Sequence, residues 1–150
     1  MTPIKVEEMS LTKKTINEQL IKDFLGNELF QSVLILGLDG KVYAYNKSPE
    51  PGEIDQIVKG FKSIKKMESF SLIGEKFIIC IKDEKPTSKV YAQNDRLGCI
   101  VIQSKKAFII GMFPKKLEVH PRICYLDNYC KQFDAQDYSY LNNQNIKIVM

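Results

Sequence analysis

Residues 32–46 read SVLILGLDGKVYAYN, and this stretch decides the class of fold. Ser32 to Leu38 is a nearly continuous apolar run, which is typical of a strand buried on both faces. Asp39-Gly40 follows as a strong hairpin signal, because the central residues of such tight turns take positive φ. Lys41 to Asn46 then alternates between apolar and polar residues. The stretch therefore predicts two antiparallel strands.

The rest of the chain extends this pair into an α+β fold. Amphipathic spacing predicts an N-terminal helix capped by the Thr15–Glu18 capping box, a second helix around residues 54–64 and a closing helix at Ile123–Phe133. Short turns separate five further predicted strands, and such tight connections require antiparallel pairing. These strands are Phe70–Ile73, Lys76–Lys82, Lys89–Asn94, Gly98–Gln103 and Ala107–Phe113. We therefore expect a single antiparallel β-sheet with the N- and C-terminal helices packed on one face.

Length and composition indicate one domain. The chain has 150 residues, of which 44% are hydrophobic and 27% charged. We expect an N-terminal tail at residues 1–11, the domain at 12–134 and a C-terminal extension at 135–150, where Ile146–Ile148 could add an edge strand. No apolar run approaches the ~20 residues of a membrane span, and the N-terminus lacks an apolar signal core. These features favour an intracellular protein.

Charge and cysteine usage exclude several classes of function. A net charge of +4 is mild, and nucleic-acid-binding domains usually carry a stronger basic stripe. The four cysteines show no CxxC spacing, so we expect reduced thiols, with Cys80 and Cys99 in apolar runs. The sequence shows no metal cluster, paired carboxylates or phosphate-cradling glycine loop, so we expect no cofactor and no enzymatic activity.

Several motifs, in order along the chain, resemble the profilin family. They are Gly37–Ala44 (GLDGKVYA), Glu53–Phe61, Leu72–Phe77 (LIGEKF), Leu97–Ile102, Ala107–Phe113 (AFIIGMF) and Pro121–Cys124 (PRIC). Each motif alone is weak, but their collinear order from about Thr15 to Phe133 is fairly specific. The resemblance implies a monomeric, cytoplasmic, cytoskeleton-associated protein that binds monomeric actin and regulates filament nucleation and growth.

The resemblance also implies which residues would contact actin. Carried over position by position, they are Met67, Lys76, Lys82, Val119, His120, Arg122 and Leu126. The three long basic side chains would form a rim that complements acidic actin, and Met67, Val119 and Leu126 would supply apolar contact at the centre. The strand around Tyr91–Asp95 lacks the basic pair that many profilins carry there.

Two further family ligands, proline-rich peptides and phosphatidylinositol bisphosphate, are less well supported by the residues. The proline-rich positions fall on Ile16, Gln19, Tyr43 and Cys130, of which only Tyr43 is aromatic. A polyproline II helix needs stacked aromatic side chains, so we expect weak or absent polyproline binding. Lys59, Lys62, Lys65 and Lys66 would form an anionic-lipid patch or, alternatively, the solvated side of a helix.

Three alternatives stay open at this stage. A signalling or trafficking scaffold of similar architecture would bind a small GTPase or dimerise, because fold alone does not fix function. A lipid-surface protein would have lost actin binding. His120 is the only histidine, and a helix would bring it close to Cys124, so the two could form a catalytic dyad; otherwise His120 is an interface or solvated loop residue.

Overall fold

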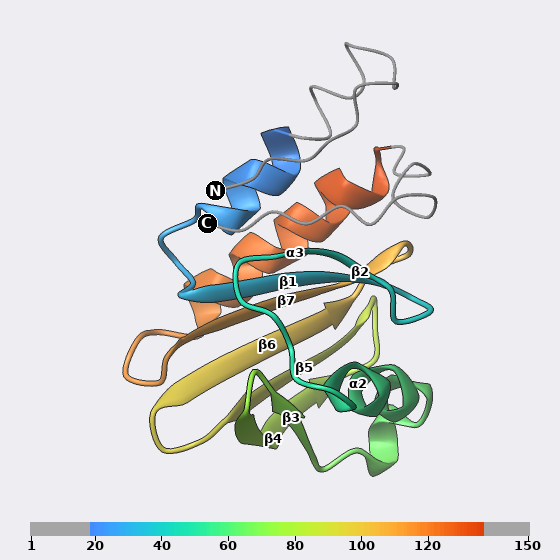
Figure 1. Cartoon of the computed structure of the whole chain (residues 1–150), viewed down its shortest axis with the longest axis vertical. Coiled ribbons are helices and arrows are strands. Elements are labelled where there is room, and N and C mark those ends of the chain that lie inside the picture. Colours follow the sequence, from blue (N-terminus) through green and yellow to red (C-terminus); the bar gives the residue numbers. More distant parts are fainter. Residues whose placement is uncertain (1–18, 137–150) are drawn as a thin grey trace.

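The computed structural model describes residues 19–136, which form one seven-stranded antiparallel sheet in the order β2-β1-β7-β6-β5-β4-β3 (Figure 1). The strands in chain order are β1 (Ser32–Gly37), β2 (Val42–Tyr45), β3 (Ser69–Leu72), β4 (Glu75–Asp83), β5 (Ser88–Gln93), β6 (Leu97–Gln103) and β7 (Ala107–Pro114). Every strand lies within two residues of the range expected from the sequence. The expected antiparallel α+β fold is confirmed.

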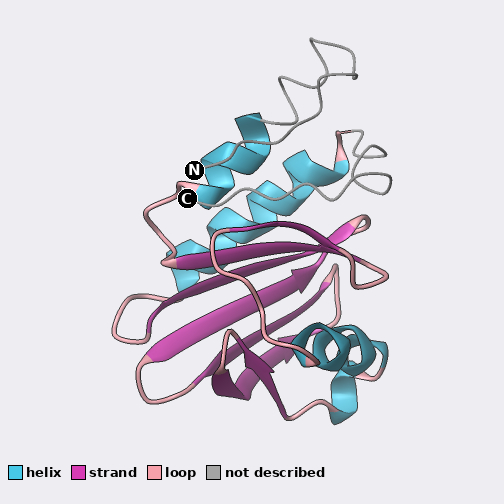
Figure 2. Ribbon diagram, viewed as in Figure 1, coloured by secondary structure: helices cyan, strands magenta, loops and turns pink. Residues whose placement is uncertain are grey.

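Helices lie on both faces of the sheet. The N-terminal helix, described over residues 19–25, lies beside α3 (His120–Asp134), and α2 (Glu53–Lys62) lies on the opposite side of the sheet with the short 3-10 helix η1 (Ile64–Lys66) after it (Figures 1 and 2). The expected packing of the two terminal helices on one face is therefore confirmed. The predicted capping box at residues 15–18 and the edge strand at 146–148 lie outside the described residues.

Each face of the sheet has its own hydrophobic core. On the face covered by the terminal helices, Phe24 and Phe133 are fully buried with Ile35 of β1. On the α2 face, Leu36 of β1 packs with Ile57 of α2. Alternate residues of β1 thus enter different cores, which explains why its apolar run is continuous.

The hairpin between β1 and β2 differs from the predicted two-residue turn. Leu36 pairs with Val42, and the Gly37 N–H donates to the Lys41 carbonyl at 2.7 Å. Within this hairpin only Gly40 has positive φ, at 94°. Asp39 instead accepts a hydrogen bond from the Lys41 N–H at 3.0 Å through its side-chain carboxylate. A three-residue loop closed by a left-handed glycine satisfies the same chain reversal, with Asp39 acting through its side chain.

A buried carboxylate joins α2 to the β3–β4 hairpin. Glu53, at the start of α2, is 5% exposed and accepts three backbone N–H bonds: from Glu50 at 2.7 Å, Ile73 at 2.7 Å and Gly74 at 2.9 Å. Ile73 and Gly74 form the two-residue turn and both have positive φ, at 52° and 74°. The carboxylate therefore satisfies the backbone of a turn that an isoleucine rarely occupies.

Candidate functional site

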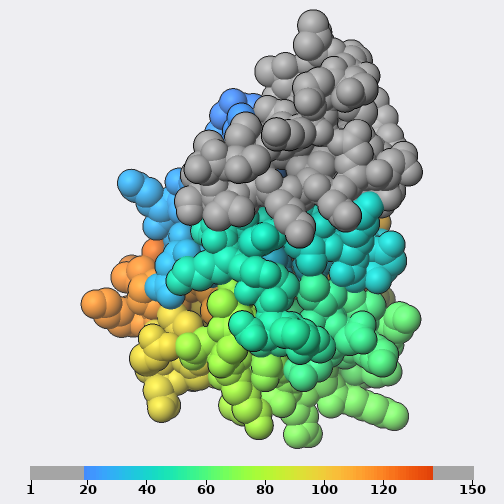
Figure 3. Space-filling view, viewed as in Figure 1, coloured from blue at the N-terminus to red at the C-terminus, as the bar shows by residue number. Residues whose placement is uncertain are grey.

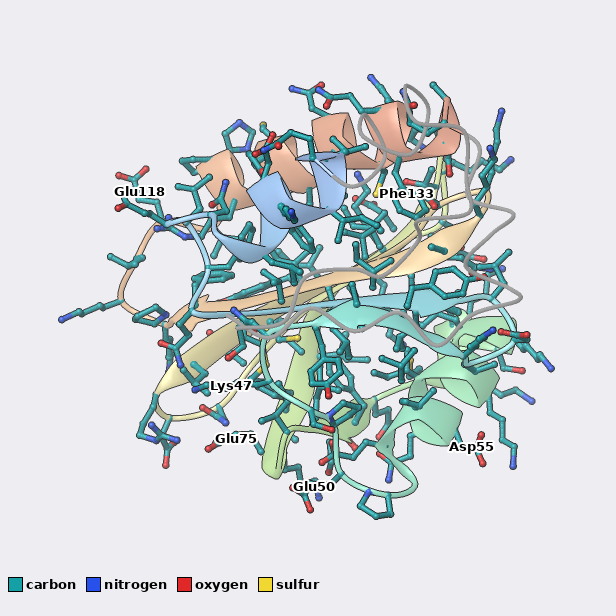
Figure 4. The ribbon with its side chains drawn as sticks, turned by 45° about the horizontal axis from the view of Figure 1, so that its top comes forward. Lys47, Glu50, Asp55, Glu75, Glu118 and Phe133 are labelled. Atoms are coloured by element: carbon teal, nitrogen blue, oxygen red, sulfur yellow. The ribbon has the colours of Figure 1, made fainter. Side chains whose placement is uncertain are left out.

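The terminal-helix face of the sheet is only partly covered by helices. Helix α3 packs mainly over β6 and β7 and reaches β5 through Lys89, which bonds to Asp127, so β4 lies beyond the part of the sheet that α3 covers. Figure 4 shows Phe133 between α3 and the sheet, where it is fully buried. By contrast, Ile78 and Ile81 of β4 are 54% and 53% exposed. Two large apolar side chains of one strand therefore lie in solvent.

A β-bulge in β4 places both isoleucines on the same face. Ile79 pairs with Ala92 and Ile81 pairs with Tyr91, so Cys80 is an extra residue without a partner on β5. Without it, Ile78 and Ile81 would point to opposite faces, because successive side chains alternate. Tyr91 belongs to the core under the terminal helices, which assigns the paired Ile81 to that side of the sheet.

We call Ile78 and Ile81, together with their cross-strand neighbours Tyr91 and Gln93 and with Lys76, the isoleucine patch. Lys76 pairs with Ser71 of β3 and is exposed; strand alternation directs it to the face of Ile78, and it also borders a hollow beside Gln56 of α2 at the sheet edge. Beside Ile78 lies a hollow of about 400 Å³ bounded by charged and amide side chains. Its lining residues are Glu75, Ile78, Asn94, Asp95 and Arg96.

The three expected basic residues do not form one rim. The bulge turns Lys82 to the α2 side, where it pairs with the buried Val90 and its Nζ donates to the Lys65 carbonyl at 2.9 Å. Arg122 donates to the Leu29 carbonyl at 2.9 Å, and its guanidinium lies 5.2 Å from the centre of the Phe113 ring. Of the three, only Lys76 belongs to the isoleucine patch.

Two of the residues expected to supply apolar contact lie in the core. Leu126 is fully buried under α3, and Met67 is 7% exposed and packs in the α2-side core, close to Gly60. Neither can offer a partner the expected surface, so this part of the prediction is wrong. Val119 is half-buried and precedes α3, whereas His120 begins the helix and is exposed.

Among the described residues, the positions expected to bind a proline-rich peptide do not form an open aromatic surface. Tyr43 and Cys130 are buried, at 6% and 4% exposure. Gln19 is exposed and donates to Asp23 at 2.7 Å, and Ile16 lies outside the described residues. Burial raises the pKa of the Cys130 thiol to about 12.

Aromatic side chains instead hold the two terminal helices together. The Phe24 and Tyr129 rings stack with centroids 4.6 Å apart, and the Tyr129 hydroxyl donates to the Leu20 carbonyl at 2.9 Å. Phe30 packs edge-on against Phe24, with centroids 6.2 Å apart. Between the described parts of the two helices, the space around Phe24 and Tyr129 is therefore filled by side chains of the protein itself.

The four lysines expected to form a lipid patch lie together around α2 and η1. Lys59 and Lys62 are in the last turn of α2, Lys65 and Lys66 are in η1, and all four are exposed. Lys82, which bonds to the Lys65 carbonyl, brings a fifth positive charge to this side. The α2 side faces the viewer in Figure 3. This basic surface and the isoleucine patch are on opposite faces of the sheet.

His120 and Cys124 are brought together by α3, with Nε2 and Sγ 3.5 Å apart. Both side chains are exposed. Within residues 19–136, no group of three or more His, Cys, Asp or Glu side chains is arranged to hold a metal ion. No helix in this part of the chain is long and apolar enough to cross a membrane.

A second cleft, of about 500 Å³, lies between α3 and the turns that flank β5 and β6. In this cleft, Nζ of Lys89 on β5 donates to Asp127 on α3 and lies 2.9 Å from both carboxylate oxygens. Asp134 accepts hydrogen bonds from the backbone N–H groups of Lys105 and Lys106 at 3.0 and 3.2 Å. The carboxylates of this cleft are therefore already paired within the fold.

Sequence reasoning missed the isoleucine patch. The run Phe77–Cys80 (FIIC) has the composition of an ordinary strand, and the exposure of Ile78 depends on where α3 stops covering the sheet. The bulge itself has no recognisable sequence signature here.

Comparison with known proteins gives a consistent result. The family model described as Profilin matches residues 13–138. Schizosaccharomyces pombe profilin has a TM-score of 0.67 at 18% identity, and Acanthamoeba castellanii profilin II has 0.65 at 20%; each match covers 76% of this chain and 93% of that chain. A chain of the LokiProfilin1/rabbit actin complex has a TM-score of 0.62 at 16% identity, covering 84% of this chain and 97% of that chain. No curated protein sequence matches.

Proposed function

The chain belongs to the profilin family, and on this premise we propose that it binds monomeric actin and so regulates filament nucleation and growth. The proposed protein is monomeric, cytoplasmic and cytoskeleton-associated, and it carries out no chemical step. Docking on the barbed end of an actin monomer would hinder nucleation.

The isoleucine patch is the observation that carries this proposal. Two isoleucines that are more than half exposed on the same face of one strand are unusual on a protein that has no partner. Protein interfaces have an apolar centre and a polar rim, and here Lys76 and Gln93 lie beside the two isoleucines. Lys76 would also meet the acidic surface of actin, which speeds encounter.

The residues proposed to contact actin therefore change. Ile78 and Ile81 replace Met67 and Leu126 as the apolar centre, because the latter two are buried. Lys76, Val119 and His120 stay in the proposal as rim residues. Lys82 lies on the α2 face and Arg122 is bonded to backbone carbonyls, so we assign neither a central role.

A polymerisation assay tests this surface. The protein should lengthen the lag of pyrene-labelled actin, assayed with rabbit actin and with actin from the source organism. Ile81→Asp and Ile78→Asp should each weaken binding by about 2 kcal/mol, which is about 30-fold in Kd, because they place a charge at the centre of the interface. Both side chains are exposed, so the variants should remain folded.

Leu38→Asp is the matched control. Leu38 is 38% exposed in the β1–β2 hairpin, at the other end of the sheet, so the same change of chemistry there should leave the lag unchanged. Folded isoleucine variants that delay polymerisation as well as the wild type would show that the patch is not the actin surface.

For proline-rich ligands we propose weak or absent binding. The two helices that would hold such a peptide are joined by Phe24, Phe30 and Tyr129, and Tyr43 is buried beside them. Titration with a proline decamer, followed by tyrosine fluorescence, should show no saturation. A micromolar Kd would contradict this proposal.

A phosphoinositide role rests on a different observation, the exposed lysines of α2 and η1. Each would contribute about 1 kcal/mol near an anionic membrane. We propose that this side binds vesicles containing phosphatidylinositol bisphosphate, with loss of co-sedimentation in Lys62→Glu/Lys65→Glu. Because the basic surface and the isoleucine patch lie on opposite faces, this variant should still delay actin polymerisation, which separates the two functions.

A further inference from the structure

The first two turns of α3 hold an exposed imidazole and an exposed thiol side by side. His120 begins the helix and Cys124 follows one turn later, so the two side chains share one face. Their Nε2 and Sγ atoms are 3.5 Å apart. The pair is unique in the chain, because the sequence has a single histidine.

The distance matches the spacing of two zinc ligands. Zinc–sulfur and zinc–nitrogen bonds are about 2.3 and about 2.05 Å long, so two such ligands at the tetrahedral angle lie about 3.6 Å apart. The helix that carries them is 15 residues long and anchored by Leu126, Tyr129 and Phe133, which are buried. The helix therefore fixes the two backbone positions one turn apart, and the donor atoms lie at a separation that suits two ligands of one zinc ion.

Nearby positive charge is directed away from the pair. Arg122 lies between the two residues in sequence, but two positions along a helix correspond to about 200° of rotation, so its side chain leaves from the other flank. There it donates to the Leu29 and Glu118 carbonyls and lies over Phe113. Lys89, the lysine of β5 that reaches α3, is neutralised by Asp127.

We propose that His120 and Cys124 form a two-residue binding site for a zinc-class ion. On binding, the Cys124 thiol loses its proton to solvent and Sγ coordinates as thiolate, while neutral His120 coordinates through Nε2 and keeps its proton on Nδ1. Thiolate and imidazole together select borderline-soft ions such as Zn²⁺ over Mg²⁺ or Ca²⁺. The other two tetrahedral positions are filled by water or by a donor from a bound partner.

The other three cysteines do not offer such a site. Cys99 and Cys130 are buried, and burial raises the pKa of both thiols, which opposes the thiolate that a metal requires. Cys80 is exposed, but the polar contact of its Sγ is the Ile78 carbonyl oxygen at 3.7 Å. Cys80 therefore serves as a matched control for an exposed thiol without an imidazole.

The test uses the full-length protein, reduced and metal-free, titrated with Co²⁺ and then with competing Zn²⁺. The expected result is sulfur-to-cobalt charge-transfer absorption that saturates at one ion per chain and disappears with Zn²⁺. Cys124→Ser should abolish the charge-transfer band, and His120→Gln should weaken binding by about 100-fold, because two linked ligands gain roughly that much over one. Cys80→Ser should titrate like the wild type.

Two results would overturn the proposal. If His120→Gln binds as tightly as the wild type, Cys124 acts as a lone thiolate and the 3.5 Å contact is only a hydrogen bond. If Cys80→Ser loses as much absorption as Cys124→Ser, the metal binds exposed thiols without selection. Far-UV circular dichroism of each variant confirms the fold, and neither His120 nor Cys124 contributes to the core, so loss of binding cannot be assigned to unfolding.

Discussion

Replacing Glu53 by alanine should destabilise this protein more than removing the charge of Asp55 or of Asp127. The carboxylate accepts three backbone N–H bonds of 2.7, 2.7 and 2.9 Å while the residue is 5% exposed. Hydrogen bonds to a charged group contribute about 1.5–3 kcal/mol each when the donor is left unsatisfied. Water can reach the Glu50 and Gly74 N–H groups, because both residues are exposed, but it reaches the half-buried Ile73 less easily.

The expected loss for Glu53→Ala is therefore about 3 kcal/mol, below the sum of three full bonds. Glu53→Gln keeps one acceptor oxygen, but its NH₂ group would face one of the three backbone N–H groups, donor against donor. We therefore expect about half the loss of unfolding free energy that Glu53→Ala causes. Asp55→Ala, an exposed carboxylate in the same helical turn, should cost under about 1 kcal/mol through the helix dipole alone.

Urea unfolding followed by far-UV circular dichroism measures all three variants on one scale. The loss of unfolding free energy should be largest for Glu53→Ala, smaller for Glu53→Gln and smallest for Asp55→Ala, if the Glu53 carboxylate accepts all three backbone hydrogen bonds. A Glu53→Ala loss no larger than that of Asp55→Ala would refute the reasoning, since the carboxylate would then contribute no more than its charge.

Three further outcomes follow from contacts in the fold. Gly111→Ala should cost about 2 kcal/mol in urea unfolding, because a new Cβ would lie 2.5 Å from the Phe30 ring, and Phe30→Leu in the same chain should recover part of that loss. Burial raises the pKa of the Cys130 thiol from 9.0 to about 12, and it also raises the pKa of the Cys99 thiol. The unfolded chain therefore releases protons above about pH 9 that the folded chain keeps, so the unfolding free energy should fall by about 1.4 kcal/mol per pH unit for each thiol. Cys130→Ala should remove the contribution of one thiol from that slope, and an unchanged slope would show that this thiol is not protected. Asp127→Asn should lower the free energy of unfolding by at most about 1 kcal/mol, and by less at high salt, because it removes the single, half-buried ion pair between Asp127 and Lys89. A loss of stability that does not depend on salt would argue against this ion pair.

Most of the sheet could be predicted because its signals are local. Apolar runs separated by turns identified all seven strands, and short connections required antiparallel pairing. The turn between the predicted strands Phe70–Ile73 and Lys76–Lys82 lies one residue earlier than their bounds imply. It is formed by Ile73 and Gly74, because β4 already begins at Glu75. Two positive φ values at a turn that contains isoleucine are held by Glu53, which lies 20 residues earlier in the sequence.

The candidate site was harder to predict, because exposure depends on contacts distant in sequence. Leu126 was expected on an interface and is in the core, since its face of α3 is turned to the sheet. Met67 follows η1 and turns inward against Gly60. Ile78 and Ile81 have the composition of core residues and are exposed, because the helix that covers β6 and β7 does not reach β4. Hydrophobicity alone cannot distinguish these cases.

The unpaired Cys80 also bears on how this strand should be compared with those of relatives. It shifts the phase of β4, so that odd-numbered positions after it occupy the side that even-numbered positions hold before it. An ungapped alignment with a strand that lacks the extra residue would match Lys82 to a position on the face that carries Ile78 and Ile81, whereas Lys82 lies on the α2 face. Opening the gap at residue 80 restores the correspondence, and residue-by-residue transfer of partner contacts then begins from Ile81.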